Sequence, residues 1–474
     1  MMNQISLPRT VPEAAGVPTS SLTRLLAELA KLDSLHSLMI LRRGRVCLEC
    51  WWRPYAPEIP HALFSLSKSF TSTAIGLAQS EGLLSIRDTL LSHFPEYGRC
   101  VTDEKMRRVT LRDLLRMASG HDRCAREWAL ADPDGDWVRG FLASPLAYEP
   151  GSRFVYNSAA TYMLAAVIRR RTGSNVREYL IPRLFAPLGI EPGLWEKCPR
   201  GTDAGGWGLS LKTEDIAKFA QLLLQNGVWN GQRLIPADYL AEATSFQIDN
   251  SANEMPDWKC GYGYQFWRSR HGFRADGASG QYALVLPEHD LAVAVTAGVA
   301  IMQRVLTPIW EILLPALAGE PLPEASAKER GKLADRIASL SLPLPPAAPR
   351  SEHAPAAWNF APNEAGIRRA ELSFGDRECR MRFFSKHGEE TLTAGFGFFA
   401  ESVLQLNDSM KRRVAACAEW RGPECLALNL CCLESSFRDE FAIDFTSPDH
   451  PLTGSGRFNT FRRLFLPENL TALP

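Results

Sequence analysis

The chain has 474 residues, and its 53 basic side chains balance its 53 acidic ones, so the formal net charge is zero. This balance argues against a nucleic-acid-binding surface, which would require an excess of Lys and Arg. The hydrophobic content of 45% allows a sizeable core, and the length indicates two or three domains. The sequence has no evident signal peptide or membrane-spanning stretch, so we expect a soluble cytoplasmic protein.

The first elements in chain order are a helix and a hairpin. Residues 17–32 carry apolar side chains at helical spacing behind a capping serine. Two strand-like runs, Ser37 to Arg42 and Arg45 to Trp52, are separated by Arg43-Gly44, which is typical of a tight hairpin. Apolar residues then continue at helical spacing from Ser65 to Gly82, which predicts an amphipathic helix with Ser65 near its N-terminus.

The middle of the chain is predicted to be mostly helical before strands return. Thr213 to Gly227 is an amphipathic helix with acidic residues in its first turn. Strand character returns in Gly263 to Trp267, Gly280 to Pro287 and Leu291 to Ala297, and a last helix is predicted from Met302 to Leu317. We therefore predict an α+β fold, in which helices flank an antiparallel sheet and a helical domain is inserted after the first hairpin.

The composition divides the chain into three segments. Residues 1–318 form the main domain, and residues 319–357 form a linker with a charged helical piece and a stiff Pro-rich run from Leu342 to Pro349. Residues 358–474 consist of short strand-like runs broken by Gly, Asn and Asp, which predicts a small β-rich accessory domain. This last segment carries no catalytic spacing of its own.

The eleven cysteines predict reduced thiols because no secretory signal accompanies them. Cys47 and Cys50 have the spacing of a redox or metal pair, but they lie in a strand-like run, where we expect positions three apart to face opposite sides. None of the nine histidines has obvious metal spacing, and for His61 and His121 a structural role is the simplest interpretation. No metal or organic cofactor is expected.

The stretch Ser65-Leu66-Ser67-Lys68 places a hydroxyl one helical turn from an amine, so the two side chains can meet on one face. A neutral Lys68, kept so by burial, could accept the serine proton in nucleophilic catalysis. Backbone N–H groups at the start of the helix could stabilise an oxyanion. A helix-capping serine beside a solvated lysine is the alternative interpretation of this spacing.

A second candidate element is Tyr156-Asn157-Ser158, which directly precedes an apolar helical run. A tyrosine held there could have its pKa lowered by the Lys68 ammonium and could pass a proton to the leaving group. The third element is Ala275 to Gln281, in which small residues precede a strand. There the Ala278 N–H could join that of Ser65 in an oxyanion hole. A core tyrosine and a Gly-rich turn are the respective alternatives, and Trp207 and Trp267 either line the cleft or pack in the core.

The order and spacing of these elements resemble the serine β-lactamase and penicillin-binding-protein superfamily, above all its class C-like branch of esterases, D-amino-acid peptidases and 6-aminohexanoate-dimer hydrolases. The resemblance spans roughly residues 10–315, and its supporting segments are Leu111 to Gly120 and Gly206 to Leu211. It implies a β-lactamase-like fold. It also implies a serine hydrolase that cleaves an ester or amide of a small molecule, with the site residues Ser65, Lys68, Tyr156, Ser158, Gly277 and Ala278.

The sequence departs from this family at two positions. Ala275 stands where relatives place the Lys or His that helps to hold a substrate carboxylate. Arg274 or His271 could substitute for that cation, but strand alternation turns Arg274 away from the face of Ala275. Ser158 replaces an Asn whose amide would contact the substrate carbonyl. These departures favour uncharged esters or amides. A β-lactamase or D-amino-acid peptidase remains an alternative, as does a non-catalytic binding or sensor protein that acts through its C-terminal domain. The oligomeric state stays open.

Overall fold

A six-stranded antiparallel sheet lies at the centre of the first part of the chain, in the order β2–β1–β10–β9–β8–β7. The computed structural model describes residues 6–345, 353–406, 410–456, 466 and 469–473. The strands are β1 (Leu35–Arg42), β2 (Arg45–Trp51), β7 (Trp267–Arg268), β8 (Phe273–Gly277), β9 (Gln281–Leu286) and β10 (Leu291–Ala297). Helices pack on both faces of this sheet, so the predicted α+β fold class is confirmed.

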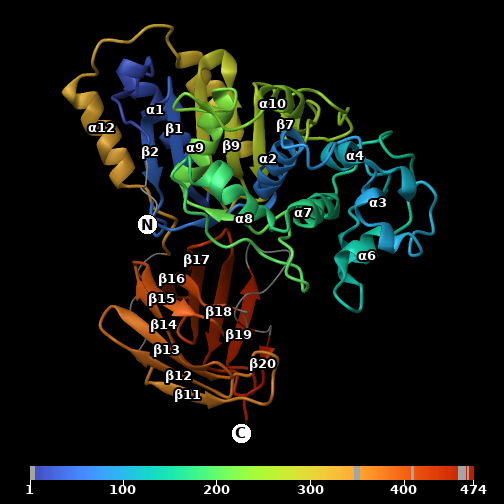
Figure 1. Cartoon of the computed structure of the whole chain (residues 1–474). Helices are drawn as coiled ribbons and strands as arrows, with labels where there is room; N and C mark the ends of the chain where they lie inside the picture. Colours follow the sequence, from blue (N-terminus) through green and yellow to red (C-terminus); the bar gives the residue numbers. More distant parts are fainter. Residues whose placement is uncertain (1–5, 346–352, 407–409, 457–465, 467–468, 474) are drawn as a thin grey trace.

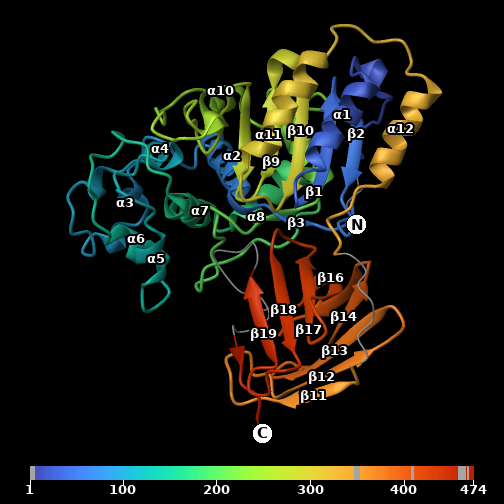
Figure 2. The ribbon, with the colours of Figure 1, turned by 180° about the vertical axis from the view of Figure 1, so that it is seen from behind.

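The side chains of the sheet alternate between two cores. In β1, Leu38 and Ile40 belong to one apolar cluster, whereas Met39 and Leu41 belong to another. The helices α1 (Thr19–Leu29) and α11 (Gln303–Pro308) cover the first face, and α12 (Ala327–Ala338) packs against α1. The helices α2 (Ser67–Ser80) and α9 (Thr213–Leu224) cover the other face (Figures 1 and 2). Among the described residues, no helix combines the length and apolarity that a bilayer crossing requires.

A helical block lies beside the sheet (Figure 1). It contains α3 (Leu90–His93), α4 (Leu111–Leu115), α5 (Arg126–Leu130), α6 (Trp137–Leu142) and α7 (Ser158–Thr172), followed by α8 (Val176–Leu180) and α10 (Ala237–Thr244). Two short ribbons, β3 (His61–Ala62) with β4 (Ser210–Leu211) and β5 (Val228–Trp229) with β6 (Gln232–Arg233), complete this part. The β3–β4 pair joins the segment before Ser65 to the segment after Gly206.

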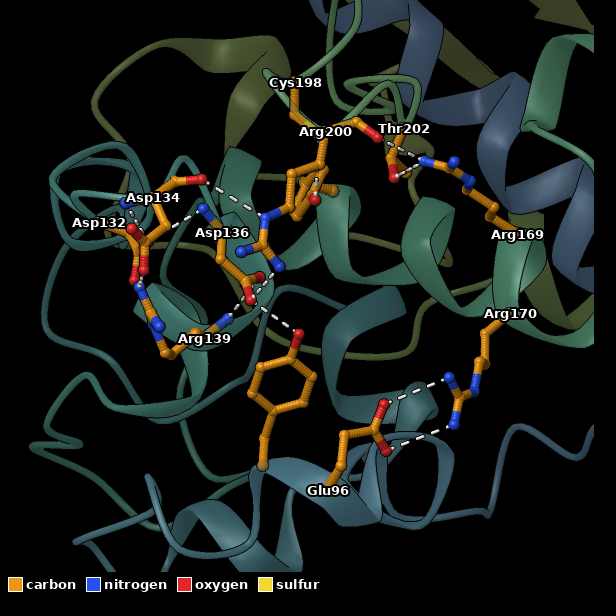
Figure 3. A network of polar contacts seen from close by, with 12 residues as sticks. Glu96, Asp132, Asp134, Asp136, Arg139, Arg169, Arg170, Cys198, Arg200 and Thr202 are labelled. Carbon is orange, nitrogen blue, oxygen red and sulfur yellow. Dashed lines mark hydrogen bonds and ion pairs between the residues drawn. The ribbon is translucent and has the colours of Figure 1, made fainter.

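A network of polar contacts fixes this block to the loop before β4 (Figure 3). Arg200 pairs with Asp136 at 2.7 Å, and Arg139 pairs with Asp132 at 2.6 Å. Arg169, on α7, donates to Thr202 Oγ1 at 2.7 Å. The Asp136 side chain is 5% exposed, whereas the Arg200 side chain is 48% exposed, so solvent reaches this ion pair from the arginine side. The network thereby fixes the course of the loop that continues to Gly206.

The C-terminal strands form a single ten-stranded sheet. They are β11 (Ala356–Asn359), β12 (Arg369–Phe374), β13 (Glu378–Ser385), β14 (Gly388–Phe396), β15 (Ala400–Leu404), β16 (Arg412–Trp420), β17 (Cys425–Cys432), β18 (Arg438–Asp444), β19 (Leu452–Gly456) and β20 (Asn469–Leu470). A bridge between Phe360 and Ala472 brings the first and last strands together, so the sheet curls around its own apolar core.

Two expectations about local structure were wrong in detail, and a third lies partly outside the described residues. The segment predicted as the strand Gly263 to Trp267 is a loop up to Trp267, and Gln265 has a φ of 64°. The predicted helix from Met302 to Leu317 is α-helical only as far as Pro308, which lacks the N–H that would continue it, and wider and tighter turns follow. Part of the predicted Pro-rich run, residues 346–349, lies outside the described residues.

The expectation that Cys47 and Cys50 face opposite sides was also wrong. The β1–β2 register shifts between Ile40 and Leu41, and this bulge turns both thiols into the same apolar cluster. Both thiols are free, and burial raises the pKa of Cys47 to about 12 and the pKa of Cys50 further still. Such thiols are inert at neutral pH.

Candidate active site

Ser65 lies in a single 3₁₀ turn (Phe64–Leu66) that leads directly into α2. The turn begins with a strained residue, because Phe64 has a φ of 49°. A bulky residue in this region costs about 1–3 kcal/mol, so the surrounding structure must hold it there. Leu63 N donates to Leu209 O at 2.8 Å, and Ser67 Oγ donates to Phe64 O at 2.7 Å. A constrained turn thus places the candidate nucleophile at the N-terminal end of α2.

Lys68 lies one turn further along, and its amine makes three hydrogen bonds. Nζ contacts Ser65 Oγ at 2.9 Å, Ser158 Oγ at 3.0 Å and the Gly206 carbonyl oxygen at 2.7 Å. The carbonyl oxygen can only accept, and a neutral amine has two hydrogens to donate. A neutral Lys68 that donates to Ser158 and Gly206 therefore has its lone pair available for the hydroxyl hydrogen of Ser65.

The environment of Lys68 favours this neutral form. The residue is 1% exposed, and its burial lowers the pKa of the amine to about 7. Cys124 and Asp276 oppose this shift, whereas the positive charge of Arg126 adds to it. A substantial fraction of the amine is therefore unprotonated at neutral pH, as a general base requires.

Tyr156 lies against the same amine. Lys68 Nζ is 4.9 Å from the centroid of the Tyr156 ring, and Trp267 stacks on that ring with a centroid separation of 5.5 Å. The expected lowering of the Tyr156 pKa was wrong. Burial raises this pKa, and a hydrogen bond with Ser65 offsets the rise only in part. The physical reason is that burial, together with the negative charge of Asp276, disfavours a phenolate. The phenol therefore carries its proton at neutral pH.

The residue between Tyr156 and Ser158 has a role that the sequence reasoning missed. Asn157 is the N-cap of α7, and its Oδ1 accepts from Ala159 N at 3.1 Å and from Ala125 N at 3.0 Å. The cap holds the start of α7 against the segment before α5, and it leaves Ser158 to face Lys68. An Asn immediately before an apolar helical run is the signal that identifies this role.

The end of β8 lies beside the Ser65 turn. A Cβ on Gly277 would lie 2.0 Å from the Leu63 carbonyl oxygen, so only glycine permits this approach. Ala278 follows and is half-buried, and its carbonyl oxygen accepts from Gln281 Nε2 at 2.9 Å. The contact brings the Ala278 backbone next to the segment that carries Ser65, as an oxyanion hole built from both N–H groups requires.

The charged residues of β8 lie on the face opposite Ala275. Ala275 is fully buried in the core beneath α2. Arg274 Nε donates to Asp276 Oδ2 at 2.9 Å, and its Cζ lies 4.5 Å from the centroid of the Trp258 ring. Arg274 is also fully buried, so this guanidinium neutralises Asp276 and offers no free cation to a substrate. His271 is exposed, and its ring lies against Trp310.

Other candidate residues have structural contacts. His61 Nε2 lies 3.0 Å from His36 Nδ1, and His121 bridges the hydroxyls of Ser119 and Ser144. Burial lowers the pKa of both His61 and His121 to about 4, so both are neutral. Across the part of the chain that the structure describes, no three His, Cys, Asp or Glu side chains are grouped to hold a metal.

Arg126 is a further residue that the sequence reasoning missed. Its guanidinium carbon lies 5.3 Å from the centroid of the Trp207 ring, and Trp207 directly follows the carbonyl that accepts from Lys68. The side chain is exposed, at the start of α5. No sequence motif marks it, because α5 reaches the site only through the packing of the helical block.

Comparison with known proteins agrees with this geometry. The Beta-lactamase family model matches residues 34–300. The chain is 26% identical over 246 residues to a 6-aminohexanoate-dimer hydrolase from Paenarthrobacter ureafaciens, with 48% of this chain and 63% of that protein covered. It thus spans slightly less than two thirds of that relative. It is also 26% identical over 305 residues to penicillin-binding protein 4 from Amycolatopsis lactamdurans, with 56% of this chain and 78% of that protein covered.

Solved structures share the fold. A crystal structure of SurE is 17% identical with a TM-score of 0.51, and the match covers 88% of this chain and 98% of that chain. The matched part of this chain is longer than residues 1–345, so the match includes strands of the C-terminal sheet. At this identity the likeness concerns the fold alone.

Proposed function

The chain belongs to the Beta-lactamase family, and on that basis we propose that it is a serine hydrolase that cleaves an ester or amide through an acyl-enzyme on Ser65. The observation that carries this proposal is the 2.9 Å contact between Ser65 Oγ and a buried Lys68 amine whose pKa is lowered to about 7. A capping serine beside a solvated lysine would show neither the burial nor the shift.

In the acylation step, Ser65 Oγ attacks the carbonyl carbon of the substrate while neutral Lys68 takes its proton. The electron pair of the carbonyl moves onto its oxygen, which the N–H groups of Ser65 and Ala278 stabilise. The tetrahedral intermediate collapses as the bond to the leaving group breaks. The protonated Tyr156 supplies the proton that this group needs, and Lys68 returns one to Tyr156.

In the deacylation step, a water molecule attacks the ester carbon of the acyl-enzyme. Tyr156 takes one proton of this water while it passes its own to neutral Lys68, and Lys68 returns a proton to Ser65 Oγ as the bond to the acyl carbon breaks. The products are a carboxylic acid and the alcohol or amine released earlier. No redox change takes place, and every proton that one group loses is taken up by another.

The charges near the site favour a substrate without a carboxylate at the position of Ala275. Ala275 itself is apolar and buried, and Arg274 is paired with Asp276. An anion there would gain no ion pair, because the Arg274 guanidinium is buried, paired with Asp276 and on the opposite face of the strand. This arrangement supports small uncharged esters and amides.

The test is a comparison of the wild-type chain with Ser65→Ala on p-nitrophenyl esters, amino-acid amides and a chromogenic cephalosporin. We expect turnover of an ester or amide by the wild type and its loss in Ser65→Ala. Ser80→Ala, at the exposed end of the same helix, is the matched control and should retain activity. Full ester hydrolysis by Ser65→Ala would exclude the proposal, and rapid turnover of the cephalosporin would reassign the substrate class.

A further inference from the structure

The C-terminal sheet reaches the segment that precedes Ser65. The turn between β17 and β18, residues 433–437, lies against β3, and Figure 2 shows this end of the sheet below the β3 label. Ala62 N donates to Glu434 O at 2.8 Å. The Phe437 ring meets the Phe64 ring edge-on, with centroids 5.7 Å apart and an interplanar angle of 78°. Phe64 is the strained residue immediately before Ser65.

Backbone hydrogen bonds and apolar packing hold the turn of residues 433–437 in place. Cys432 N donates to Phe437 O at 2.9 Å, and Leu433 N donates to Arg413 O at 2.9 Å. The Leu433 side chain is 1% exposed and lies in the apolar cluster that also contains Tyr55 of the main domain. Tyr55 in turn donates its hydroxyl hydrogen to Ser435 O at 3.3 Å. The turn is therefore continuous with the core of the main domain, and it can hold a neighbouring segment in place.

The Phe64 ring packs against the turn of residues 433–437, whereas the Phe64 backbone is held by the main domain. The bonds from Leu63 N to Leu209 O and from Ser67 Oγ to Phe64 O fix the chain on either side of the ring. The ring contacts Phe437, which lies in the turn immediately before β18. A residue with a positive φ relaxes to a common conformation when its contacts are removed, and here relaxation would move the backbone of Ser65.

We propose that Phe437 is a positioning residue for Ser65: by packing on Phe64, it keeps the Ser65 turn in the geometry that reaction requires. This inference rests on the proposed function of Ser65 and gives the C-terminal domain a part in it. Phe437 acts through Phe64, so its removal should slow the reaction of bound substrate and leave substrate binding unchanged.

The test compares three variants. Phe437→Ala should lower kcat for a p-nitrophenyl ester about tenfold, with KM unchanged within about twofold, because reacting groups are misplaced after binding. Phe437→Leu, which keeps an apolar contact, should restore most of kcat. Phe445→Ala is the matched control: Phe445 lies beyond the opposite end of β18, where it stacks on His353, and its loss should leave kcat unchanged. A rise in KM with kcat unchanged in Phe437→Ala would overturn the proposal.

Hydrogen exchange provides a readout that does not need turnover. Amides of residues 61–66 should exchange faster in Phe437→Ala than in the wild type, and they should be unaffected in Phe445→Ala. Unchanged exchange in Phe437→Ala would also overturn the positioning role. If the wild type neither hydrolyses esters nor reacts at Ser65, the proposed function fails, and this exchange measurement alone then decides whether the C-terminal turn holds the segment.

Discussion

Gly277 approaches Leu63 so closely that a Cβ at this glycine would lie 2.0 Å from the Leu63 carbonyl oxygen. The atom in the way is backbone, which cannot swing aside as a side chain does. This contact joins the end of β8 to the turn that carries Ser65. The relative position of the Ser65 and Ala278 backbones depends on it.

We expect Gly277→Ala to separate β8 from the Ser65 turn. The loss of one oxyanion donor from its position should lower kcat by about 100-fold, and overpacking should lower the free energy of unfolding by about 1–3 kcal/mol. Steady-state kinetics and denaturant unfolding measure the two effects. Gly331→Ala is the control, because a Cβ there meets nothing within 4 Å in helix α12, and it should stabilise the protein by roughly 0.5–1 kcal/mol. Unchanged kcat in Gly277→Ala would contradict the oxyanion assignment.

The pH dependence of activity should follow Lys68. The amine must be neutral to act as a base, so kcat/KM should fall as the pH drops below about 7. Arg126 lowers the pKa of Lys68, and Arg126→Gln should therefore move this acidic limb to higher pH. Arg123→Gln is the matched control, because Arg123 is also exposed and is paired with Glu127. Identical pH profiles for all three proteins would show that Arg126 has no electrostatic influence on the base.

The buried histidine pair should make the protein sensitive to acid. The pKa of His61 is lowered to about 4 from its ordinary value of 6.5, so the unfolded chain takes up a proton before the folded one. The free energy of unfolding should fall as the pH decreases from 6.5 towards 4. In His61→Gln this decrease should be smaller, whereas the exposed His387→Gln should behave as the wild type does. Equal acid sensitivity of His61→Gln and the wild type would assign the effect to other groups.

The polar network of the helical block should matter more for stability than for chemistry. Asp136 pairs with Arg200, accepts from the Tyr97 hydroxyl at 2.7 Å and caps α6. Asp136→Ala should lower the free energy of unfolding by about 2 kcal/mol, since a cap is lost and a tyrosine hydroxyl loses its acceptor. Asp134→Ala removes a carboxylate whose side chain is 62% exposed, and should change stability by less than about 1 kcal/mol. Denaturant unfolding of both variants gives the comparison, and equal losses would contradict the assigned role of the buried carboxylate.

The parts of the fold that the sequence predicted are those set by local spacing. The hairpin around Arg43-Gly44 and the helix after Ser65 follow from patterns of a few residues, and Ser65 and Lys68 meet because positions three apart share a helix face. Cys47 shows the limit of this reasoning, because one bulge in the strand reverses the face of a side chain. Pro308 shows a second limit, because the apolar residues keep their helical spacing beyond it although the α-helix ends there.

The parts of the site that could not be predicted depend on contacts between distant segments. Arg126 acts on Lys68 because α5 packs near Trp207, and no spacing within the chain encodes that distance. The packing of Phe437 on Phe64 joins two segments that lie at opposite ends of the chain, and only the placement of the C-terminal sheet brings them together. The Tyr156 pKa is raised because of burial, a quantity that the sequence does not give.

The most direct test of the central claim is the mass of the protein during turnover. The wild-type chain would be mixed with a p-nitrophenyl ester, quenched in acid within the first turnovers, and digested for peptide mass spectrometry. We predict that the mass of the acyl group is added to the peptide that contains Ser65, and that Ser65→Ala carries no such addition. Hydrolysis by the wild type without an adduct on that peptide, or an equal adduct in Ser65→Ala, would contradict an acyl-enzyme on Ser65.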